Sequence, residues 1–169
     1  TAVELQDVYL YVGQTYNPDS PFKNVTDKEG KALKAADIDW YYIDEVKTKS
    51  LDTSKPDSHD IRIVYLDGGG KWKYSKTHKL VIKENKSSIQ TKDSELYAGQ
   101  VWNKADNFVS ATDEEGKVVP FEDARITTNE ASVNTTIPGV YELKYSFKGV
   151  GKTTDSMFTV TVKEEESSL

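Results

Sequence analysis

Apolar and polar residues alternate in several short runs along this chain, and no helical periodicity extends over an ordinary helix length. The clearest run covers residues 141–147, after a Pro-Gly turn at 138–139, and a second covers residues 158–162. Alternation with a period of two places every second side chain on one face of a strand. The pattern therefore predicts two strands whose inward faces carry one set of apolar residues: Tyr141, Leu143, Tyr145, Phe147, Phe158, Val160 and Val162.

The first half of the chain carries similar but shorter runs. Residues 3–5 and 8–11 are interpreted as an edge strand in two pieces, and alternation predicts that Ile38, Trp40 and Tyr42 share one face of a further strand. Residues 44–60 are polar and include Pro56, so we expect mostly loop before the alternation resumes at Ile61. Gly, Pro and Asp interrupt these runs about every ten residues, a spacing typical of antiparallel β-sandwiches.

The chain contains one sequence written twice. Leu-Tyr-Val-Gly-Gln at residues 10–14 returns as Leu-Tyr-Ala-Gly-Gln at residues 96–100, an offset of 86, and the turn at residues 26–31 returns at 112–117. Internal repeats indicate stacked or tandem modules. We therefore predict an all-β protein of two tandem Ig-like antiparallel β-sandwich domains, residues 1–85 and 86–169.

The repeat loses its constant spacing in the later strands. Aligning Tyr65 with Tyr145, and Ile82 with Val162, gives an offset of 80 instead of 86. The first copy is therefore expected to carry six extra residues, placed between Asp37 and Ile61.

Composition narrows the class of function. The chain has no cysteine, which excludes disulfides and Cys-ligated zinc, and its net charge of -6 argues against binding a nucleic-acid backbone. No apolar run reaches the length of a membrane span, so no membrane insertion is expected. The sequence starts at Thr1 without a signal peptide, which we interpret as a fragment of a longer protein.

The second copy resembles the bacterial Ig-like domain of group 3. The resemblance covers nearly the whole copy and rests on Leu96, Tyr97, Gly99, Gln100, Trp102, Asn107, Phe108, Ala111, Thr112, Asp113, Gly116, Pro138, Gly139, Tyr141, Leu143, Tyr145, Phe158, Val160 and Val162. The first copy keeps Leu10, Tyr11, Gly13, Gln14, Phe22, Thr26, Asp27 and Gly30. It lacks Pro-Gly before Ile61 and has His78 in place of Phe158, so it resembles a divergent member.

The resemblance implies an Ig-like sandwich in tandem repeats of wall-anchored or internalin-type surface proteins of Gram-positive bacteria. It implies an extracellular location at the cell surface or cell wall, a non-catalytic stalk or adhesive role, and adjacent repeats of the same chain as neighbours. No Leu-Pro-x-Thr-Gly sorting motif is present in the sequence. We expect no catalytic residue, no cofactor and a monomer.

One stretch indicates contact with a ligand. Residues 68–70 are three glycines, and Lys71, Trp72, Lys73 and Tyr74 follow them. The second copy has Lys152 and Thr154 where Trp72 and Tyr74 stand, so exposed aromatics that contact a host glycan or protein are one interpretation. The other is that both aromatics cover the inserted residues while the lysines protect an edge strand from aggregation.

Other polar clusters have simpler explanations. His59 and His78 lie in no nucleophile motif, and residues 57–60 match no known metal-binding loop. His78 shares its parity with Leu80 and Ile82, which predicts a partly buried, hydrogen-bonded side chain. The Asp-x-x-Gly stretches at residues 27–30 and 113–116 lack the alternating carboxylates of a calcium loop, so they predict plain β-turns.

Overall fold

The structure, a computed structural model, describes residues 1–164 and divides into two compact units, residues 1–84 and the chain from Asn85 onward. Strands dominate both units, which confirms the all-β class. The helices among the described residues are three 3-10 turns, η1 (Ala35–Asp37), η2 (Lys104–Asn107) and η3 (Glu130–Ser132). No helix in this part of the chain has the length and apolar character needed to cross a bilayer.

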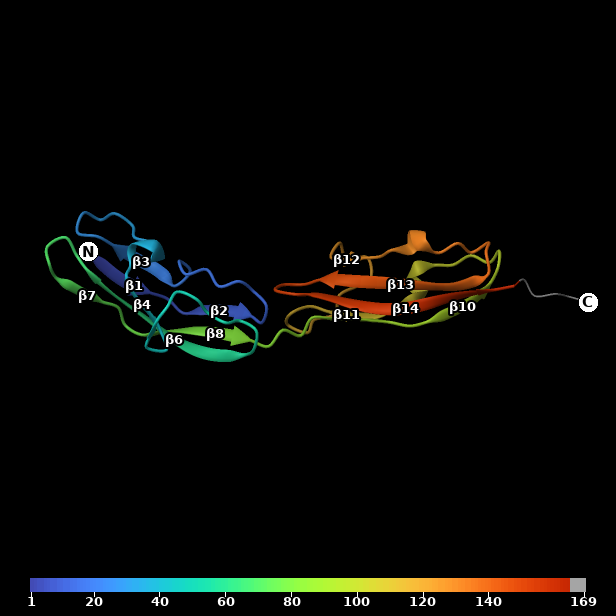
Figure 1. Ribbon diagram of the computed structural model, residues 1–169, viewed down its shortest axis with the longest axis horizontal. Coiled ribbons are helices and arrows are strands. Elements are labelled where there is room, and N and C mark those ends of the chain that lie inside the picture. The colour runs from blue at the N-terminus through green and yellow to red at the C-terminus, as the bar shows by residue number, and fades with distance from the viewer. Residues whose placement is uncertain (165–169) are drawn as a thin grey trace, which may run out of the picture. The chain divides into compact units, whose positions relative to one another are not determined.

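The first unit is a sandwich of a large and a small sheet (Figure 1). The large sheet has the order β2 (Val8–Tyr11), β8 (His78–Lys83), β6 (Asp57–Leu66), β4 (Trp40–Ile43) and β5 (Val46–Lys47), and β7 (Trp72–Tyr74) also pairs with β6. The small sheet pairs β1 (Ala2–Leu5) with β3 (Phe22–Thr26). The core between them is built from Leu5, Val8, Tyr16, Val25, Ala35, Ile38, Tyr41, Ile43, Ile61, Ile63, Tyr65 and Leu80.

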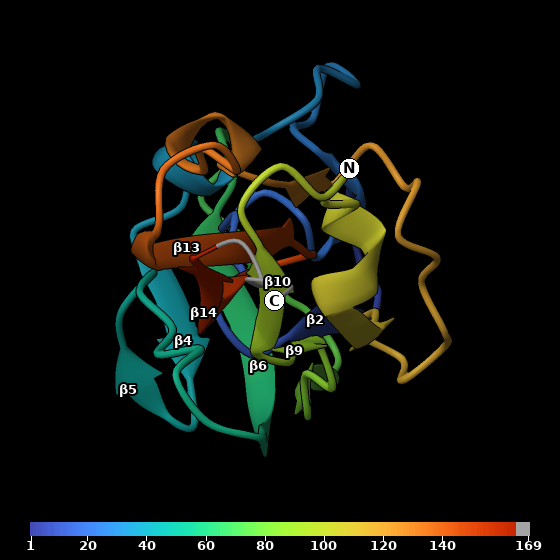
Figure 2. The ribbon, with the colours of Figure 1, turned by 90° about the vertical axis from the view of Figure 1, so that its right-hand side faces the viewer.

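The second unit repeats this plan with fewer strands. Its larger sheet has the order β10 (Ser94–Tyr97), β14 (Thr153–Lys163), β13 (Gly139–Lys148) and β12 (Ile126–Thr127), and β9 (Ser88–Thr91) pairs with β11 (Phe108–Thr112) (Figure 1 and Figure 2). The predicted inward faces are confirmed: Leu143, Tyr145, Phe147, Phe158, Val160 and Val162 are buried, and Tyr141 is partly buried and packs against this core.

The first and last strands of each unit's larger sheet run parallel. β2 pairs in parallel with β8, where Val8 lies opposite Leu80, and β10 pairs in parallel with β14, where Ser94 lies opposite Val160. The polypeptide therefore enters a unit near one end of the sandwich and leaves it near the other, as the course of β2 and β8 shows (Figure 1).

The repeated Leu-Tyr-x-Gly-Gln sequence ends the first of these parallel strands. The Gln14 side chain accepts a hydrogen bond from the backbone N–H of Tyr11 at 2.7 Å, and Gln100 accepts one from Tyr97 at the same distance. Gly13 and Gly99 have φ values of 94° and 87°, a conformation that favours glycine. The motif is thus explained by turn geometry.

The Asp-x-x-Gly stretches are hairpin turns, as predicted. The Oδ1 atom of Asp27 accepts hydrogen bonds from the N–H groups of Glu29 and Lys31, and Asp113 does the same for Glu115 and Lys117. Asp67 repeats the arrangement with Gly69 and Lys71. These Oδ1 atoms stabilise the turn backbone.

The strand pairing corrects the position of the inserted residues. Lys79 and Thr159, 80 residues apart, both donate their N–H to an aspartate of the repeat, Asp7 or Asp93, which confirms the offset of 80 in the last strand. Ile82 lies opposite Asp57, however, and Val162 lies opposite Gly139, so β6 and β13 are offset by 82. Tyr65 therefore corresponds to Phe147, and the alignment of Tyr65 with Tyr145 is wrong.

The six extra residues are consequently split. Four precede β6, from the change of offset between 86 and 82, and two lie between β6 and β8, from the change between 82 and 80. The error arose because tyrosine was matched with tyrosine, although buried positions accept different apolar side chains. The corrected offset superposes the buried series Ile61, Ile63 and Tyr65 on Leu143, Tyr145 and Phe147.

The face predicted for Trp40 is also wrong. Ile38, Tyr41 and Ile43 are buried, whereas Trp40 and Tyr42 lie on the opposite, outer face of β4. A bend at Asp39 breaks the strict alternation, so Ile38 and Trp40 do not share a face. In addition, β6 starts at Asp57 within the stretch expected to be mostly loop, because its polar first residues pair with β8.

A buried tyrosine serves the same purpose in both units but comes from different strands. The hydroxyl of Tyr41 on β4 donates to the carbonyl of Pro18, and that of Tyr145 on β13 donates to the carbonyl of Lys104, each at 2.8 Å. Pro18 and Lys104 are related by the offset of 86. Tyr41 lies opposite Ile63, the residue that corresponds to Tyr145, so the tyrosine has changed strands within one cross-strand pair.

Candidate functional site

The outer face of the large sheet in the first unit carries a group of apolar side chains, of which Leu66, Trp72 and Tyr74 are exposed and Val64 is buried. We call it the aromatic face and define it by Trp40, Val64, Leu66, Trp72 and Tyr74. Trp40 and Tyr74 each lie opposite Val64, and Trp72 lies opposite Leu66, so the pairing places all five on one side of the sheet. Trp72 is 47% exposed and Tyr74 is 67% exposed.

Trp40 anchors this face. Its ring packs edge-on against Trp72, with 4.9 Å between ring centroids, and the Lys47 ammonium lies 5.9 Å from the Trp40 centroid. Contacts of this kind fix ring orientation and each contribute about 1 kcal/mol. Trp72 therefore packs on a neighbouring ring while about half of its surface remains exposed.

The second unit has a polar surface at these positions. Strand pairing relates Val64 and Leu66 to Ser146 and Lys148, and the residues opposite them on β14 are Asp155 and Thr153. The two units thus share a sandwich plan but differ in this surface. The fold itself does not require exposed aromatics here.

The two lysines proposed as ligand contacts lie off the aromatic face. Lys73 alternates with Trp72 and Tyr74, pairs with Tyr65, and holds its ammonium 3.9 Å from Asp67 Oδ2. Lys71 lies in the turn, where its backbone N–H donates to Asp67. The structure brings Trp72 and Tyr74 together with Trp40 and leaves Lys71 and Lys73 to the side.

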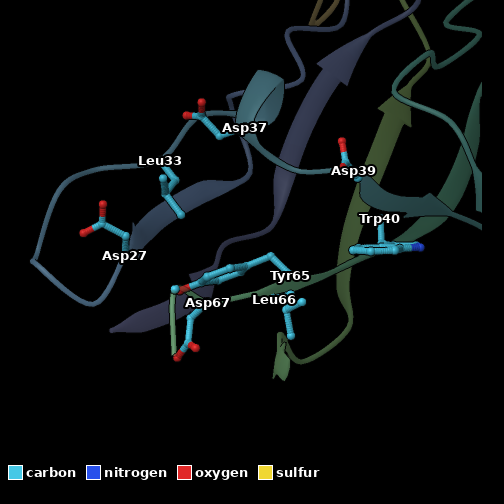
Figure 3. A pocket seen from close by; sticks show the side chains of 9 residues that line it. Asp27, Leu33, Asp37, Asp39, Trp40, Tyr65, Leu66 and Asp67 are labelled. Atoms are coloured by element: carbon cyan, nitrogen blue, oxygen red, sulfur yellow. The ribbon is translucent and has the colours of Figure 1, made fainter. Parts of the chain in front are cut away.

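A cavity of about 330 Å³ opens beside Trp40, and we call it the Trp40 pocket (Figure 3). Three segments distant in sequence build it: the turn and loop after β3, the start of β4, and the end of β6. Its walls include two aromatic rings and four carboxylates, from Trp40, Tyr65, Asp27, Asp37, Asp39 and Asp67. The lining of the pocket therefore combines aromatic rings with carboxylates, and Asp39 lies beside Trp40 while Asp67 lies beside Tyr65 (Figure 3).

The carboxylates of this pocket are only partly used by the backbone. Asp37 Oδ2 accepts the N–H of Lys34 in a cap of η1, and Asp67 Oδ1 accepts the N–H groups of Gly69 and Lys71. The N–H of Lys71 lowers the pKa of Asp67 below its usual value. Asp67 is therefore ionised at neutral pH and keeps a negative charge at the wall of the pocket.

The histidines are part of surface ion pairs. His59 Nδ1 lies 2.6 Å from Asp44 Oδ2, and His78 Nδ1 lies 3.0 Å from Asp7 Oδ1, which confirms that His78 is hydrogen-bonded. Two hydrogen bonds lower the pKa of Asp44. The larger effect comes from the backbone N–H of Asp60 and the smaller one from the side chain of His59. Within residues 1–164, no three His, Asp or Glu side chains group in a way that could hold a metal ion.

Sequence reasoning found Trp72 and Tyr74 but missed Trp40 and its pocket. The signal for Trp72 was the contrast with polar residues in the second copy. Trp40 gave no such signal because the predicted face placed it beside Ile38. The pocket could not be found from spacing, since residues 27, 37–40 and 65–68 meet only in the folded unit.

Comparison with solved structures finds two-domain and multidomain β proteins at low similarity. A structure of Clostridium perfringens ZmpB, containing the M60 catalytic domain with CBM51-1 and CBM51-2, is 17% identical with a TM-score of 0.41. That alignment covers 82% of this chain but only 18% of the ZmpB chain. The fibronectin(III)-like modules of Clostridium thermocellum CbhA are 10% identical, cover 98% of this chain and 95% of theirs, and have a TM-score of 0.31.

No curated protein matches the sequence. The family comparison finds a match within the second unit. Residues 89–162 match the family model of the bacterial Ig-like domain (group 3), the family that the sequence of this copy resembles.

Proposed function

We propose that the two units are non-catalytic spacer modules of an extracellular bacterial surface protein, held at the cell wall of a Gram-positive bacterium. The observation that carries the proposal is the parallel pairing of first and last strands, β2 with β8 and β10 with β14. A module that the chain enters at one end and leaves at the other adds its own length to a string of modules. The family match of residues 89–162 supports the bacterial Ig-like type.

The length of each module can be estimated from its longest hairpin. β13 has 10 residues and β14 has 11, which at about 3.3 Å per residue gives a module of roughly 35 Å. Small-angle X-ray scattering of the whole chain measures the relevant dimension. A spacer is expected to show a maximum dimension about twice that of one module, and a value near that of one module would contradict the role.

A second candidate function is adhesion through the first unit. The aromatic face is exposed in the first unit and polar in the second, and exposed aromatics commonly form the centre of glycan or protein contacts. Binding would place a host glycan or protein on Trp72 and Tyr74, next to Trp40. This role and the spacer role are compatible in one protein.

Trp72→Ala tests the second function. Trp72 is about half exposed, so its loss is expected to change the free energy of unfolding by no more than about 1 kcal/mol, the size of its ring contact with Trp40. Binding to a glycan array or to host-cell proteins should fall strongly. Met157→Ala removes an even more exposed apolar side chain, at 67%, from β14 and should leave binding unchanged.

A further inference from the structure

We propose that the Trp40 pocket binds an arginine side chain presented by a partner polypeptide. The inference does not depend on the spacer role, because it concerns one pocket of the first unit and holds whether or not the modules act as spacers. It rests on a comparison between the two copies of the module inside this chain. The second copy shows what occupies the corresponding place.

In the second unit the side chain of Arg125, which is 43% exposed, covers that place. Its guanidinium carbon lies 5.1 Å from the centroid of the Phe147 ring, and its Nε and NH2 atoms each donate to the carboxylate of Asp123 at 3.0 Å. Asp113 and Glu114 add negative charge close enough to raise the pKa of Arg125, after the larger effect of Asp123. The guanidinium is thus held between an aromatic ring and carboxylates.

Three of the groups around Arg125 have like counterparts in the Trp40 pocket, whereas Glu114 corresponds to Lys28, whose side chain lies at the rim. The offset of 86 relates Asp123 to Asp37 and Asp113 to Asp27, and the offset of 82 relates Phe147 to Tyr65. Asp27, Asp37 and Tyr65 all line the pocket. The first unit therefore keeps the surroundings of a guanidinium.

The first unit keeps no guanidinium of its own at this place. Asp39 directly precedes β4, as Arg125 directly precedes β12, although the two strands pair in registers that differ by one residue. The single arginine of the first unit, Arg62, donates three hydrogen bonds to Glu45 and stacks on Tyr42 instead. A pocket of about 330 Å³ remains open at the place that Arg125 covers in the second unit.

Two further changes favour a cation from outside. Asp39 and Asp67 add carboxylates to the pocket, whereas the second unit has Arg125 and Gly149 at these points. Trp40 adds a second aromatic wall. A planar guanidinium suits the added carboxylates and the added aromatic wall, because it forms paired hydrogen bonds with carboxylates and stacks on aromatic rings. An ammonium does both less well.

One cation of the first unit lies at the rim. The Lys28 side chain passes along Gly68, where an added Cβ would meet its Cε atom at 3.1 Å. Lys28 is on a surface turn and can swing away, so it competes with a ligand but does not close the pocket. Lys28→Ala is accordingly expected to strengthen binding about twofold or more.

The direct test is a titration of the whole chain with the peptide acetyl-Gly-Gly-Arg-Gly-Gly-amide, followed by 1H-15N NMR. Shifts are expected at the Trp40 indole and at the backbone of Asp39 and Asp67, with millimolar affinity. Replacing the arginine by citrulline, which has the same shape without the charge, should weaken binding at least tenfold. Equal binding of the citrulline peptide would overturn the proposal, and so would the absence of shifts at tens of millimolar peptide.

Paired variants separate the pocket from general charge. Asp39→Lys places a cation in the pocket and should abolish binding of the arginine peptide. Glu142→Lys makes the same charge change on β13 of the second unit and should alter affinity less than twofold. Equal losses in both variants would overturn the proposal.

The neutral trisaccharide chitotriose provides the competing outcome. If it perturbs the Trp40 pocket more strongly than the arginine peptide does, and still binds to the Asp39→Lys variant, the pocket is a sugar site and the proposal fails. Failure here leaves the spacer role intact, since scattering tests that role separately.

Discussion

The hydroxyl groups of Tyr16 and Tyr41 are hydrogen-bonded to each other inside the first unit. Tyr41 uses its own proton to bond the carbonyl of Pro18, so Tyr16 donates and Tyr41 accepts. The chain of two hydroxyls connects the loop after β2 to the centre of β4. Both tyrosines are at least nine-tenths buried, so each lost bond leaves a polar group without water.

Tyr41→Phe is expected to destabilise the first unit by about 2–3 kcal/mol, because it leaves both the Tyr16 hydroxyl and the Pro18 carbonyl without their hydrogen-bond partner. Tyr16→Phe removes only the outer donor and should cost about 1 kcal/mol. Urea unfolding of the full chain, followed by NMR signals of each unit, measures both values. The reverse order of the two losses would show that the direction of the hydrogen bonds is wrong.

Alkaline pH should weaken the first unit before the second. Burial raises the pKa of Tyr16 to about 12 and raises the pKa of Tyr41 as well, while in the second unit burial raises that of Tyr145 to about 12. A raised folded-state pKa gives stability that is complete below the unfolded value near 10 and is lost as pH rises from there through the folded value. Each tyrosine contributes at most about 1.4 kcal/mol per pH unit to this loss.

Thermal unfolding of the two units between pH 8 and pH 12 checks this expectation, with the absorbance of tyrosinate as a parallel signal. Burial also raises the pKa of Tyr65, so the first unit has three such hydroxyls against one in the second and should lose stability more steeply. Tyr16→Phe serves as the control, because it should bring the slope of the first unit closer to that of the second. Equal slopes in the unmodified units would contradict the prediction.

Asn107 should be the most sensitive polar residue of the second unit. It is fully buried, accepts from Trp102 Nε1 at 2.8 Å, and donates to the Lys92 carbonyl and to Ser94 Oγ at 2.9 Å each. Asn107→Ala leaves all three partners unsatisfied and is expected to cost about 3 kcal/mol or more.

The matched control for Asn107 is the exposed Asn103. Its side chain accepts only from the N–H of Ala105, and Asn103→Ala should cost about 1 kcal/mol, the usual value of a helix cap. Denaturant unfolding monitored by the fluorescence of Trp102 would record both variants. Similar costs for the two would mean that water replaces the buried contacts.

Two glycines should respond to alanine for different reasons. Gly30 has a φ of 80° with nothing within 4 Å of an added Cβ, so Gly30→Ala should cost about 1 kcal/mol from backbone strain alone. At Gly149 an added Cβ would lie 2.7 Å from Ser87 Oγ and 3.0 Å from a ring carbon of Phe147. Overpacking against this buried ring should cost about 2 kcal/mol.

The double variant Gly149→Ala with Ser87→Gly distinguishes these causes. Removing the Ser87 side chain opens the space and should recover part of the loss caused by Gly149→Ala. Differential scanning calorimetry of the single and double variants provides the measurement. If the losses of the two single variants simply add in the double variant, the Cβ added at Gly149 is accommodated without movement of Ser87.

The sequence was sufficient for the β class and for most strands because the inward residues of β13 and β14 alternate without interruption. Sequence-based prediction failed where the strict alternation of apolar and polar residues is interrupted. The bend at Asp39 reversed the face of Trp40. The polar residues 57–60 concealed the start of β6, since backbone pairing with β8 does not require apolar side chains.

The candidate site was only half predictable for a related reason. Trp72 and Tyr74 stood out because the sequence alignment matched them with Lys152 and Thr154. Strand pairing corrects their counterparts to Thr153 and Asp155, which are polar as well. The Trp40 pocket depends on Tyr65 matching Phe147 instead of Tyr145, and that match becomes visible only from the pairing of β6 with β8. Because the sequence alignment was wrong by two residues, it did not match Phe147, which lies beside Arg125, with Tyr65 of the Trp40 pocket.

The parallel course of β2 beside β8, and of β10 beside β14, also determines how a module responds to force. Tension on the two ends of a module pulls such strands past each other lengthwise, so the hydrogen bonds between them are strained together instead of opening one after another. Four residue pairs join each of these couples, from Val8 with Leu80 to Tyr11 with Lys83 in the first. Stretching therefore meets its greatest resistance where the polypeptide enters and leaves.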